Sequence, residues 1–291
     1  MIARLSGRSK PTQEERETMR SRLSLTEHGV VAGMIVFALL LILPLTGRAR
    51  DDGQAVACMA NLRMLSQAWL DYAADNDGKI CNGFVPRNSQ YADENYWTGT
   101  SGFGGPYKDN AWWVNPPHNA QGIYTGDPIP CPMEDELNGI RTGKLYPYVE
   151  RVNAYHCPAD RGYLRQTQRA GWRGYSITGL MNGEQPRDPK CVRSVHEIVN
   201  PGDKYVFLET TDPRGWNMGS WIIAPYQYPP SWIDPLEIRH DGRSTFGFAD
   251  GHVEIHAWVD KSTLETAPVN WGTREGRDIS YLVRGYVPGQ R

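Results

Sequence analysis

The residues closest to a catalytic or metal-binding pattern lie near the C-terminus: His240, Asp250, Gly251 and His252. A histidine titrates near neutral pH, and a histidine beside an aspartate can move a proton or hold a metal ion. A metal site would need further donors, such as Glu254, to converge with His240 and Asp250. The alternative is structural, with His240 holding a β-hairpin by a hydrogen bond. We favour this alternative, so we predict no catalytic residue, no metal ligand and no cofactor.

The chain has five cysteines, and an odd number leaves at least one thiol unpaired. They are Cys58, Cys81, Cys131, Cys157 and Cys191. No CxxC spacing occurs, which argues against a structural zinc site. Cys131 and Cys157 each precede a proline in loop-like sequence and are candidates for a disulfide, although other pairings stay open.

Sequence motifs of common enzyme classes are missing. The chain has no GxSxG, P-loop or HExxH motif. Its formal net charge is -2, and no dense basic stripe follows residue 50. We therefore predict a non-enzymatic protein with no nucleic-acid partner.

Two alternating segments position the C-terminal residues. Residues 244–248 and 252–259 alternate apolar and polar, and an Asp-Gly turn joins them, which predicts a β-hairpin. A further strand is predicted over 204–209, where β-forming residues follow a turn sequence. The core face of the hairpin is predicted to carry Phe246, Phe248, Val253, Ile255 and Ala257. Glu254 and His256 would then lie on the outer face.

A long helix is predicted before these strands, over residues 23–77. Its apolar part, 30–45, contains no charged residue and covers about 24 Å. That length is slightly below the roughly 30 Å of a bilayer core, and we predict a transmembrane helix over 23–47. From Arg48 on, apolar residues recur at steps of three and four, which predicts an amphipathic stalk helix over 48–78.

The flanks of the apolar part predict its orientation. Residues 1–22 carry six basic residues against three glutamates, whereas Arg48 and Arg50 are followed by two aspartates. The positive-inside rule then places 1–22 in the cytoplasm as a basic leader. We predict a single-pass protein of the inner (cytoplasmic) membrane whose head, 79–291, is periplasmic or extracellular. A cleaved secretory signal is the alternative, but no clear cleavage site of small residues precedes the amphipathic helix.

Residues 82–140 are irregular, rich in glycine, proline and aromatic residues, and too long for an ordinary connection. Their tryptophans include Trp97, Trp112 and Trp113. Such side chains can stack on sugars or on a protein partner. They can also pack this aromatic insertion onto the body of the protein, which is the interpretation we favour.

The C-terminal residues also carry a resemblance to a known family. His240, nine intervening residues and then Asp250-Gly251 resemble the signature of the prepilin-type processing-associated H-x9-DG domain. Three earlier segments resemble other landmarks of this family, in the same order: 58–63, 72–78 and 156–160. The resemblance implies a type IV pilin-like or type II secretion pseudopilin-like subunit. It also implies an α+β fold, in which a long N-terminal helix with a membrane-spanning first half and an amphipathic second half packs on an antiparallel β-sheet head.

The resemblance extends to the start of the helix, with one departure. Residues 22–27 align with the family's processing site, and Glu27 and Pro44 fall where the family has a glutamate and a helix-loosening proline. Arg22, however, replaces the small residue that the family's peptidase requires before Leu23. Two predictions therefore stay open. One is a subunit that assembles with other pilin-like subunits, and the other is an unprocessed, anchored protein that binds a glycan or a protein partner through the aromatic insertion.

Overall fold

The chain divides into two compact units, Met1–Arg50 and Asp51–Arg291. Within the long helix described below, side chains are described for residues 28–37 and from residue 49 on. The computed structural model describes residues 25–85, 111–126, 131–164, 169–211, 214–217, 219–265, 272–273 and 275–289.

Helix α2, Leu25–Asp75, is the longest element of the described chain. In the second unit its apolar side chains recur at steps of three and four and are buried: Ala55, Cys58, Leu62, Leu65, Trp69 and Tyr72. The helix is closed by a hydrogen bond in which the Gly78 N–H donates to the Ala73 carbonyl oxygen at 2.8 Å. Gly78 has a φ of 79°, a left-handed conformation that glycine adopts without a steric cost. The helix thus ends close to residue 78, where the amphipathic helix is predicted to end.

A four-stranded antiparallel sheet packs against α2. Its strands, in spatial order, are β2 (Tyr175–Ile177), β3 (Tyr205–Glu209), β7 (Arg243–Phe248) and β8 (Val253–Ala257). Strands β7 and β8 form the predicted hairpin, and β3 is the strand predicted over 204–209. Gly247 lets α2 approach closely, because a Cβ there would lie 2.4 Å from Ser66 Oγ of the helix.

The sheet carries a hydrophobic core on both faces. On one face, Phe207 of β3 belongs to the same core as Leu62 and Trp69 of α2. On the other face, Phe246 of β7 meets Tyr281 of helix α7 (Arg277–Tyr286), with ring centroids 5.8 Å apart. Every residue of β3 is consequently buried.

The predicted division of the hairpin into a core face and an outer face is wrong. Phe246 pairs with Glu254 across the hairpin, so these two side chains share a face. Val253 pairs with Gly247 and lies on the opposite face from Phe246. The register depends on how many residues the turn contains, and a shift of one residue moves every side chain to the other face. Because both faces are covered, apolar residues occur on each.

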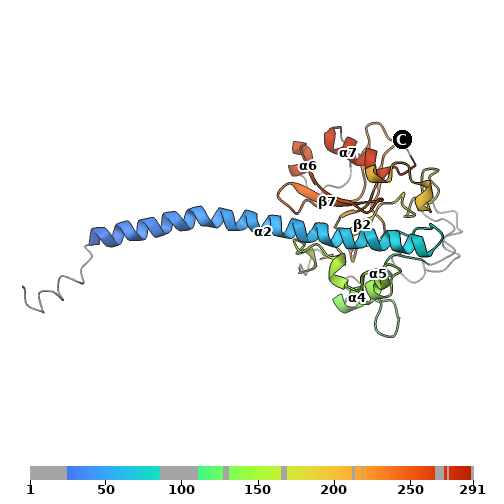
Figure 1. Ribbon diagram of the computed structural model, residues 1–291, viewed down its shortest axis with the longest axis horizontal. Coiled ribbons are helices and arrows are strands. Elements are labelled where there is room, and N and C mark those ends of the chain that lie inside the picture. The colour runs from blue at the N-terminus through green and yellow to red at the C-terminus, as the bar shows by residue number, and fades with distance from the viewer. Residues whose placement is uncertain are drawn as a thin grey trace, which may run out of the picture. The chain divides into compact units, whose positions relative to one another are not determined.

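Further short elements lie in the described part of the second unit. Strand β1 (Arg169–Ala170) pairs with β4 (Arg214–Gly215), while β5 (Ile223–Ala224), β6 (Ser231–Trp232) and β9 (Gly272–Thr273) form a third sheet. The other α-helices among the described residues are α4 (Met133–Arg141), α5 (Tyr146–Val149) and α6 (Lys261–Glu265). The 3-10 helices are η2 (Val152–Tyr155), η3 (Gly162–Leu164), η4 (Val195–Glu197) and η5 (Pro201–Asp203). Figure 1 shows α4 and α5 on the side of α2 opposite β2 and β7, so α2 is the central helix of this unit.

In the described part of the chain, no helix is both long and apolar enough to cross a membrane. This finding contradicts the transmembrane helix predicted over 23–47, and with it the single-pass anchor, the cytoplasmic N-terminus and the predicted inner-membrane location of a periplasmic or extracellular head. The apolar run over 30–45 is shorter than the roughly 20 apolar residues that a span requires, and Glu27 and His28 closely precede it. The fold class is therefore corrected to α+β with an antiparallel sheet, without the membrane-spanning first half.

The predicted aromatic insertion, 82–140, is described in part. Trp112 and Trp113 are buried, with exposed fractions of 6% and 0%, and Trp113 stacks on Tyr155 with ring centroids 5.8 Å apart. Trp97 lies outside the described residues. The two described tryptophans thus pack this segment onto the body of the protein and offer no free ring to a sugar.

Candidate metal centre

Four side chains with metal-binding atoms meet between α2 and the sheet. Cys58 lies in α2, Cys157 follows η2, Glu209 ends β3 and His240 precedes β7. Their ligand atoms all lie within 4.8 Å of one another, and each of the four residues has an exposed fraction of 0%. These four residues are called the buried cluster below.

Hydrogen bonds hold the buried cluster together around Glu209. The Glu209 Oε1 atom lies 2.8 Å from His240 Nε2 and accepts a hydrogen bond of 2.5 Å from Thr245 Oγ1. The Cys157 Sγ atom lies 3.5 Å from His240 Nε2 and 3.9 Å from Glu209 Oε1. Glu209 Oε2 is buried without a hydrogen-bond partner among the described residues, and so is His240 Nδ1. An unpaired buried polar atom costs about 1–3 kcal/mol, so Glu209 Oε2 is an atom that a cation would stabilise.

Two side chains of α2 hold the segment around Cys157 in place. Asn61 Nδ2 donates to the His156 carbonyl oxygen at 2.9 Å, and Gln54 Nε2 donates to the Pro158 carbonyl oxygen at 3.1 Å. These bonds flank Cys157 on both sides. Both donors lie one turn from the α2 thiol, which puts all three on one face of the helix. The sequence of α2 therefore supplies one thiol and positions the second.

The environment of the buried cluster favours a thiolate at Cys157. Burial raises the pKa of the Cys58 thiol. Burial acts in the same direction on Cys157, but hydrogen bonds with Cys58 and His240 outweigh it and lower the pKa of Cys157. Burial by itself lowers the pKa of His240, but the hydrogen bonds with Cys157 and Glu209 outweigh it and raise the pKa of His240. Because these ionisable side chains are removed from water, bound protons or a bound cation must stabilise them instead.

The buried cluster does not have the geometry of a cysteine–histidine–carboxylate relay. In such a relay the histidine uses one ring nitrogen for the nucleophile and the other for the carboxylate. Here Cys157 Sγ and Glu209 Oε1 both lie against Nε2 of His240. Because all these residues are fully buried, a substrate has no surface on which to reach the thiol. Two thiols, an imidazole and a carboxylate are instead side chains that can bind a metal ion.

Asp250 and His252 lie away from the buried cluster. His240 precedes β7 and Asp250 follows it, and six strand residues span about 20 Å. Asp250 Oδ1 lies 2.5 Å from His252 Nδ1, and His252 Nε2 lies 3.5 Å from Glu254 Oε1. Gly251, with a φ of 90°, forms the turn between the strands. These residues close the hairpin and form no joint site with His240.

The structure does not contain the predicted disulfide between Cys131 and Cys157, because all five cysteines are free thiols. Cys131 Sγ donates to Glu136 Oε1 at 3.5 Å, whereas Cys157 belongs to the buried cluster. The two thiols are thus held by different partners.

The predicted processing residues lie at the start of the chain. Arg22 and Leu23 are outside the described residues. Glu27 and Pro44 lie within α2, and their side chains are also outside the description.

The sequence-based interpretation missed Cys58 and Glu209 as partners of His240. No local spacing connects the donors, because they are spread from residue 58 to residue 240. The available signal was in the family landmarks, since Cys58, Cys157 and His240 each lie in a segment that resembles one of them. The predicted hydrogen bond of His240 exists, but it joins the side chain to Glu209 of β3 rather than to the hairpin.

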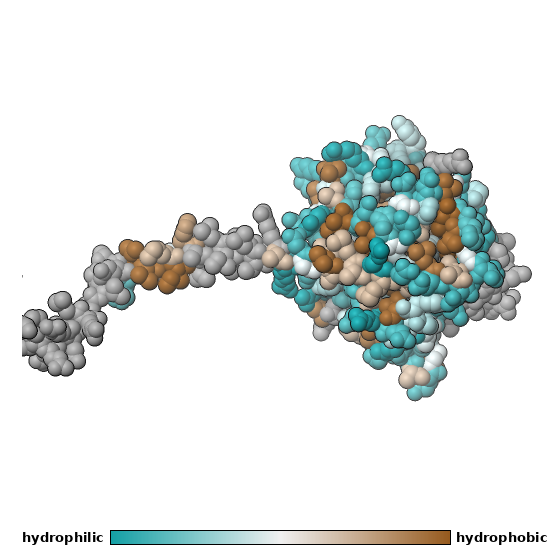
Figure 2. Space-filling view, viewed as in Figure 1, coloured by the Kyte–Doolittle hydropathy of each residue, from teal (hydrophilic) through white to brown (hydrophobic). Residues whose placement is uncertain are grey.

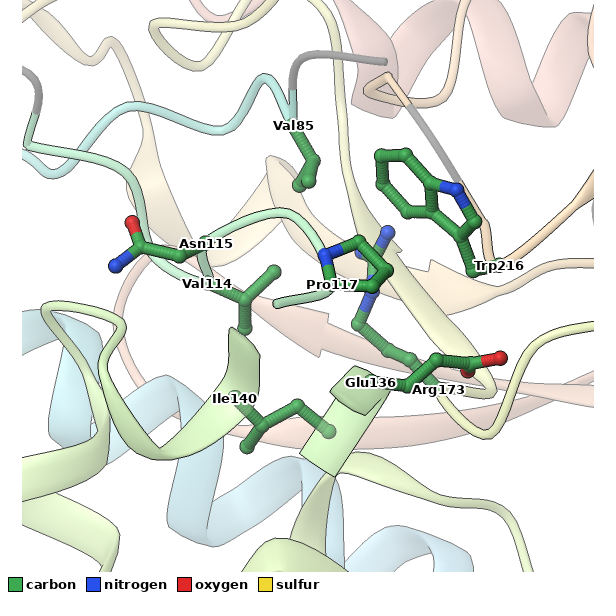
Figure 3. A pocket seen from close by; sticks show the side chains of 8 residues that line it. All are labelled: Val85, Val114, Asn115, Pro117, Glu136, Ile140, Arg173 and Trp216. Atoms are coloured by element: carbon green, nitrogen blue, oxygen red, sulfur yellow. The ribbon is translucent and has the colours of Figure 1, made fainter. Parts of the chain in front are cut away.

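A second polar site lies beside α4, at a small cavity. Glu136 Oε2 accepts a hydrogen bond of 2.6 Å from the Trp172 backbone N–H. Burial raises the pKa of Glu136 to about 7, against the opposing effects of this bond, of Cys131 and of Arg173. The cavity volume of about 10 Å³ has room for one water molecule and excludes a larger ligand. Figure 3 shows the lining side chains, which are Val85, Val114, Asn115, Pro117, Glu136, Ile140, Arg173 and Trp216.

Comparison of the chain with protein-family models, with curated proteins and with solved structures gave no match. The function proposed for the chain therefore depends on its own residues and geometry.

Proposed function

We propose that the chain is a non-enzymatic, type IV pilin-like or type II secretion pseudopilin-like subunit that assembles through the apolar part of α2. The observation that carries this proposal is the exposure of that part of the helix. Six apolar side chains between residues 30 and 37 have exposed fractions of 44–65%: Val30, Val31, Met34, Ile35, Val36 and Phe37. In Figure 2 hydrophobic atoms gather on this stretch of the helix. Exposed apolar patches of this kind mark interaction surfaces.

The arrangement of these six side chains indicates several neighbours rather than one. At about 100° per residue these side chains point to all sides of the helix. Viewed down the helix axis, neighbouring side-chain directions are at most about 100° apart. A helix with one partner needs only one apolar stripe, whereas a helix that is apolar all round is buried on every side. Packing of equivalent helices side by side, as the family resemblance implies, would cover all of them.

Two further features support the proposal. The second part of α2 packs on an antiparallel sheet, which is the arrangement that the family resemblance implies. The ordered landmarks of the H-x9-DG family, including His240 and Asp250-Gly251, add to it. For the alternative function, binding of a glycan through the aromatic insertion, Trp112 and Trp113 are not available because both are buried.

The test is the oligomeric state of the full chain, measured by analytical ultracentrifugation over a range of concentrations and by electron microscopy. We expect ordered oligomers or filaments for the native chain. The double substitution Ile35→Glu and Phe37→Glu should convert them into monomers, because charges cannot be buried between packed helices without a large cost.

The matched control is Val56→Glu, which changes an equally exposed apolar residue of the same helix within the second unit. It should leave assembly unchanged. A native chain that remains monomeric at every concentration would contradict the proposal, and so would equal losses for Val56→Glu and the double variant.

A further inference from the structure

We propose that the buried cluster of Cys58, Cys157, Glu209 and His240 is a closed, four-coordinate site for Zn²⁺. All four donors belong to the second unit, so the proposal does not depend on assembly through the apolar part of α2. Its role would be structural, since four protein ligands leave no open position for a substrate.

The distances between Cys157, His240 and Glu209 lie near the edge lengths of a tetrahedral zinc site, and the Cys58 thiol lies within 4.8 Å of these donors. Zinc binds sulfur at about 2.3 Å and nitrogen or oxygen at about 2.0–2.2 Å, so the edges of the tetrahedron measure about 3.3–3.8 Å. The 3.5 Å between Cys157 Sγ and His240 Nε2 matches such an edge, and the 3.9 Å between Cys157 Sγ and Glu209 Oε1 is slightly longer. The 2.8 Å between His240 Nε2 and Glu209 Oε1 is a hydrogen bond, which would open by about 0.5 Å around the ion.

The donor types select zinc over the common hard cations. Calcium and magnesium prefer sites made only of oxygen atoms. Thiolate and imidazole ligands suit zinc and copper, and the carboxylate of Glu209 together with a tetrahedral, closed arrangement favours zinc. The two thiols and the carboxylate bind as anions, and their protons are released when the metal enters. A divalent cation would then offset most of the charge that burial makes costly.

A disulfide between Cys58 and Cys157 is the competing explanation for two thiols at one buried place. It would account for the sulfur atoms alone. The convergence of Glu209 and His240 on the same point would remain unexplained. A metal ion accounts for all four residues.

The surroundings of the cluster hold its ligands in place, as the outer shell of a metal site does. Thr245 Oγ1 donates to Glu209 Oε1 at 2.5 Å, and Asn61 holds the backbone next to Cys157. Through these ligands the ion would join four separate segments of the chain: α2, the loop after η2, the end of β3 and the loop before β7. Removal of the ion should therefore lower the stability of the whole unit.

The test begins with the full chain purified without a metal-chelating column, and its metal content is measured by elemental mass spectrometry. We expect about one zinc ion per chain. A mercurial that binds the two cluster thiols should release this ion. After exchange with Co²⁺ alone, the chain should show the charge-transfer absorption of a cobalt–thiolate bond. A chelator should lower the melting temperature, and added Zn²⁺ should restore it.

Variants separate the site from general folding. Cys58→Ser, Cys157→Ser and His240→Gln should lose most of the zinc, whereas Cys81→Ser, a buried thiol outside the cluster, should retain it. Thr245→Val keeps all four ligands and is the variant to measure if the ligand variants fail to fold. It should weaken zinc binding by about 10–100-fold, the usual effect of an outer-shell change.

Three results would overturn the proposal. One is a native chain that contains no zinc and takes up neither Zn²⁺ nor Co²⁺. Another is a Cys58–Cys157 disulfide found by peptide mapping of the native chain. The third is zinc retained by the folded Cys58→Ser and His240→Gln variants.

Discussion

Glu136 is a single residue whose environment links stability to pH. Its carboxylate is largely removed from water, and burial raises its pKa from 4.5 to about 7. The unfolded chain loses this proton at a lower pH than the folded chain does. Between about pH 4.5 and pH 7 the folded state therefore binds more protons, and stability falls as the pH rises through this window.

Replacing Glu136 with glutamine should remove this contribution to the pH dependence. Glutamine keeps an oxygen that can accept the hydrogen bond from the Trp172 N–H but carries no charge. At pH 8 the Glu136→Gln variant should be more stable than the native chain by about 1–2 kcal/mol, and at pH 4 the two should be nearly equal. The measurement is urea unfolding at both pH values. Glu134→Gln, at an exposed position of the same helix, is the control, and an unchanged pH slope for Glu136→Gln would show that the inference about Glu136 is wrong.

At the scale of elements, close contact between α4 and a neighbouring segment depends on a glycine. A Cβ added at Gly139 would lie 2.4 Å from the Asn115 carbonyl oxygen and 2.9 Å from the Pro116 carbonyl oxygen. Both are backbone atoms, so the two segments would have to separate. The Asn115 N–H also donates to the Gly139 carbonyl oxygen at 2.8 Å, and separation would weaken this bond.

Gly139→Ala should therefore destabilise the protein by about 1–3 kcal/mol, as other overpacking substitutions do. Gly53→Ala is the comparison, because this glycine lies within α2 and nothing stands within 4 Å of the added Cβ. It should stabilise the protein by about 0.5–1 kcal/mol through helix propensity. The melting temperatures of the two variants should move in opposite directions, and a shift in the same direction would refute this account of the two positions.

At the scale of the whole molecule, the second unit is built around α2. One hydrophobic core joins α2 residues such as Leu62 and Trp69 to Phe207 of the sheet and to Trp113 of the aromatic insertion. A second core lies on the far side of the sheet and includes Phe246 and Leu282. Loss of packing on α2 should consequently weaken the whole unit rather than one edge.

The substitution Leu62→Ala tests this central position. Leu62 has an exposed fraction of 0%, and truncating a buried leucine costs about 2–5 kcal/mol. Val56→Ala, at an exposed position on the same helix, should change stability by less than about 0.5 kcal/mol. Denaturant unfolding followed by tryptophan fluorescence and by circular dichroism measures both. If the Leu62→Ala variant unfolded at different denaturant concentrations by fluorescence and by circular dichroism, α2 would not hold the unit together as one cooperative structure.

The sequence by itself determined the elements whose signals are local. The Asp-Gly turn between alternating segments predicted β7 and β8, and the turn before residue 204 predicted β3. The amphipathic pattern over 48–78 predicted that α2 ends near residue 78. Each of these depends on neighbouring residues and on backbone conformations that only a few residue types adopt.

Only the tertiary structure decided which faces are buried and which distant residues meet. The register of β7 and β8 put Phe246 opposite Glu254, because the pairing of strands is not contained in their alternation. The buried cluster arises where α2 packs on the sheet, and its donors come from residues as far apart as 58 and 240. A spacing rule such as CxxC detects only ligands that one local segment supplies, whereas these four ligands depend on how four segments pack.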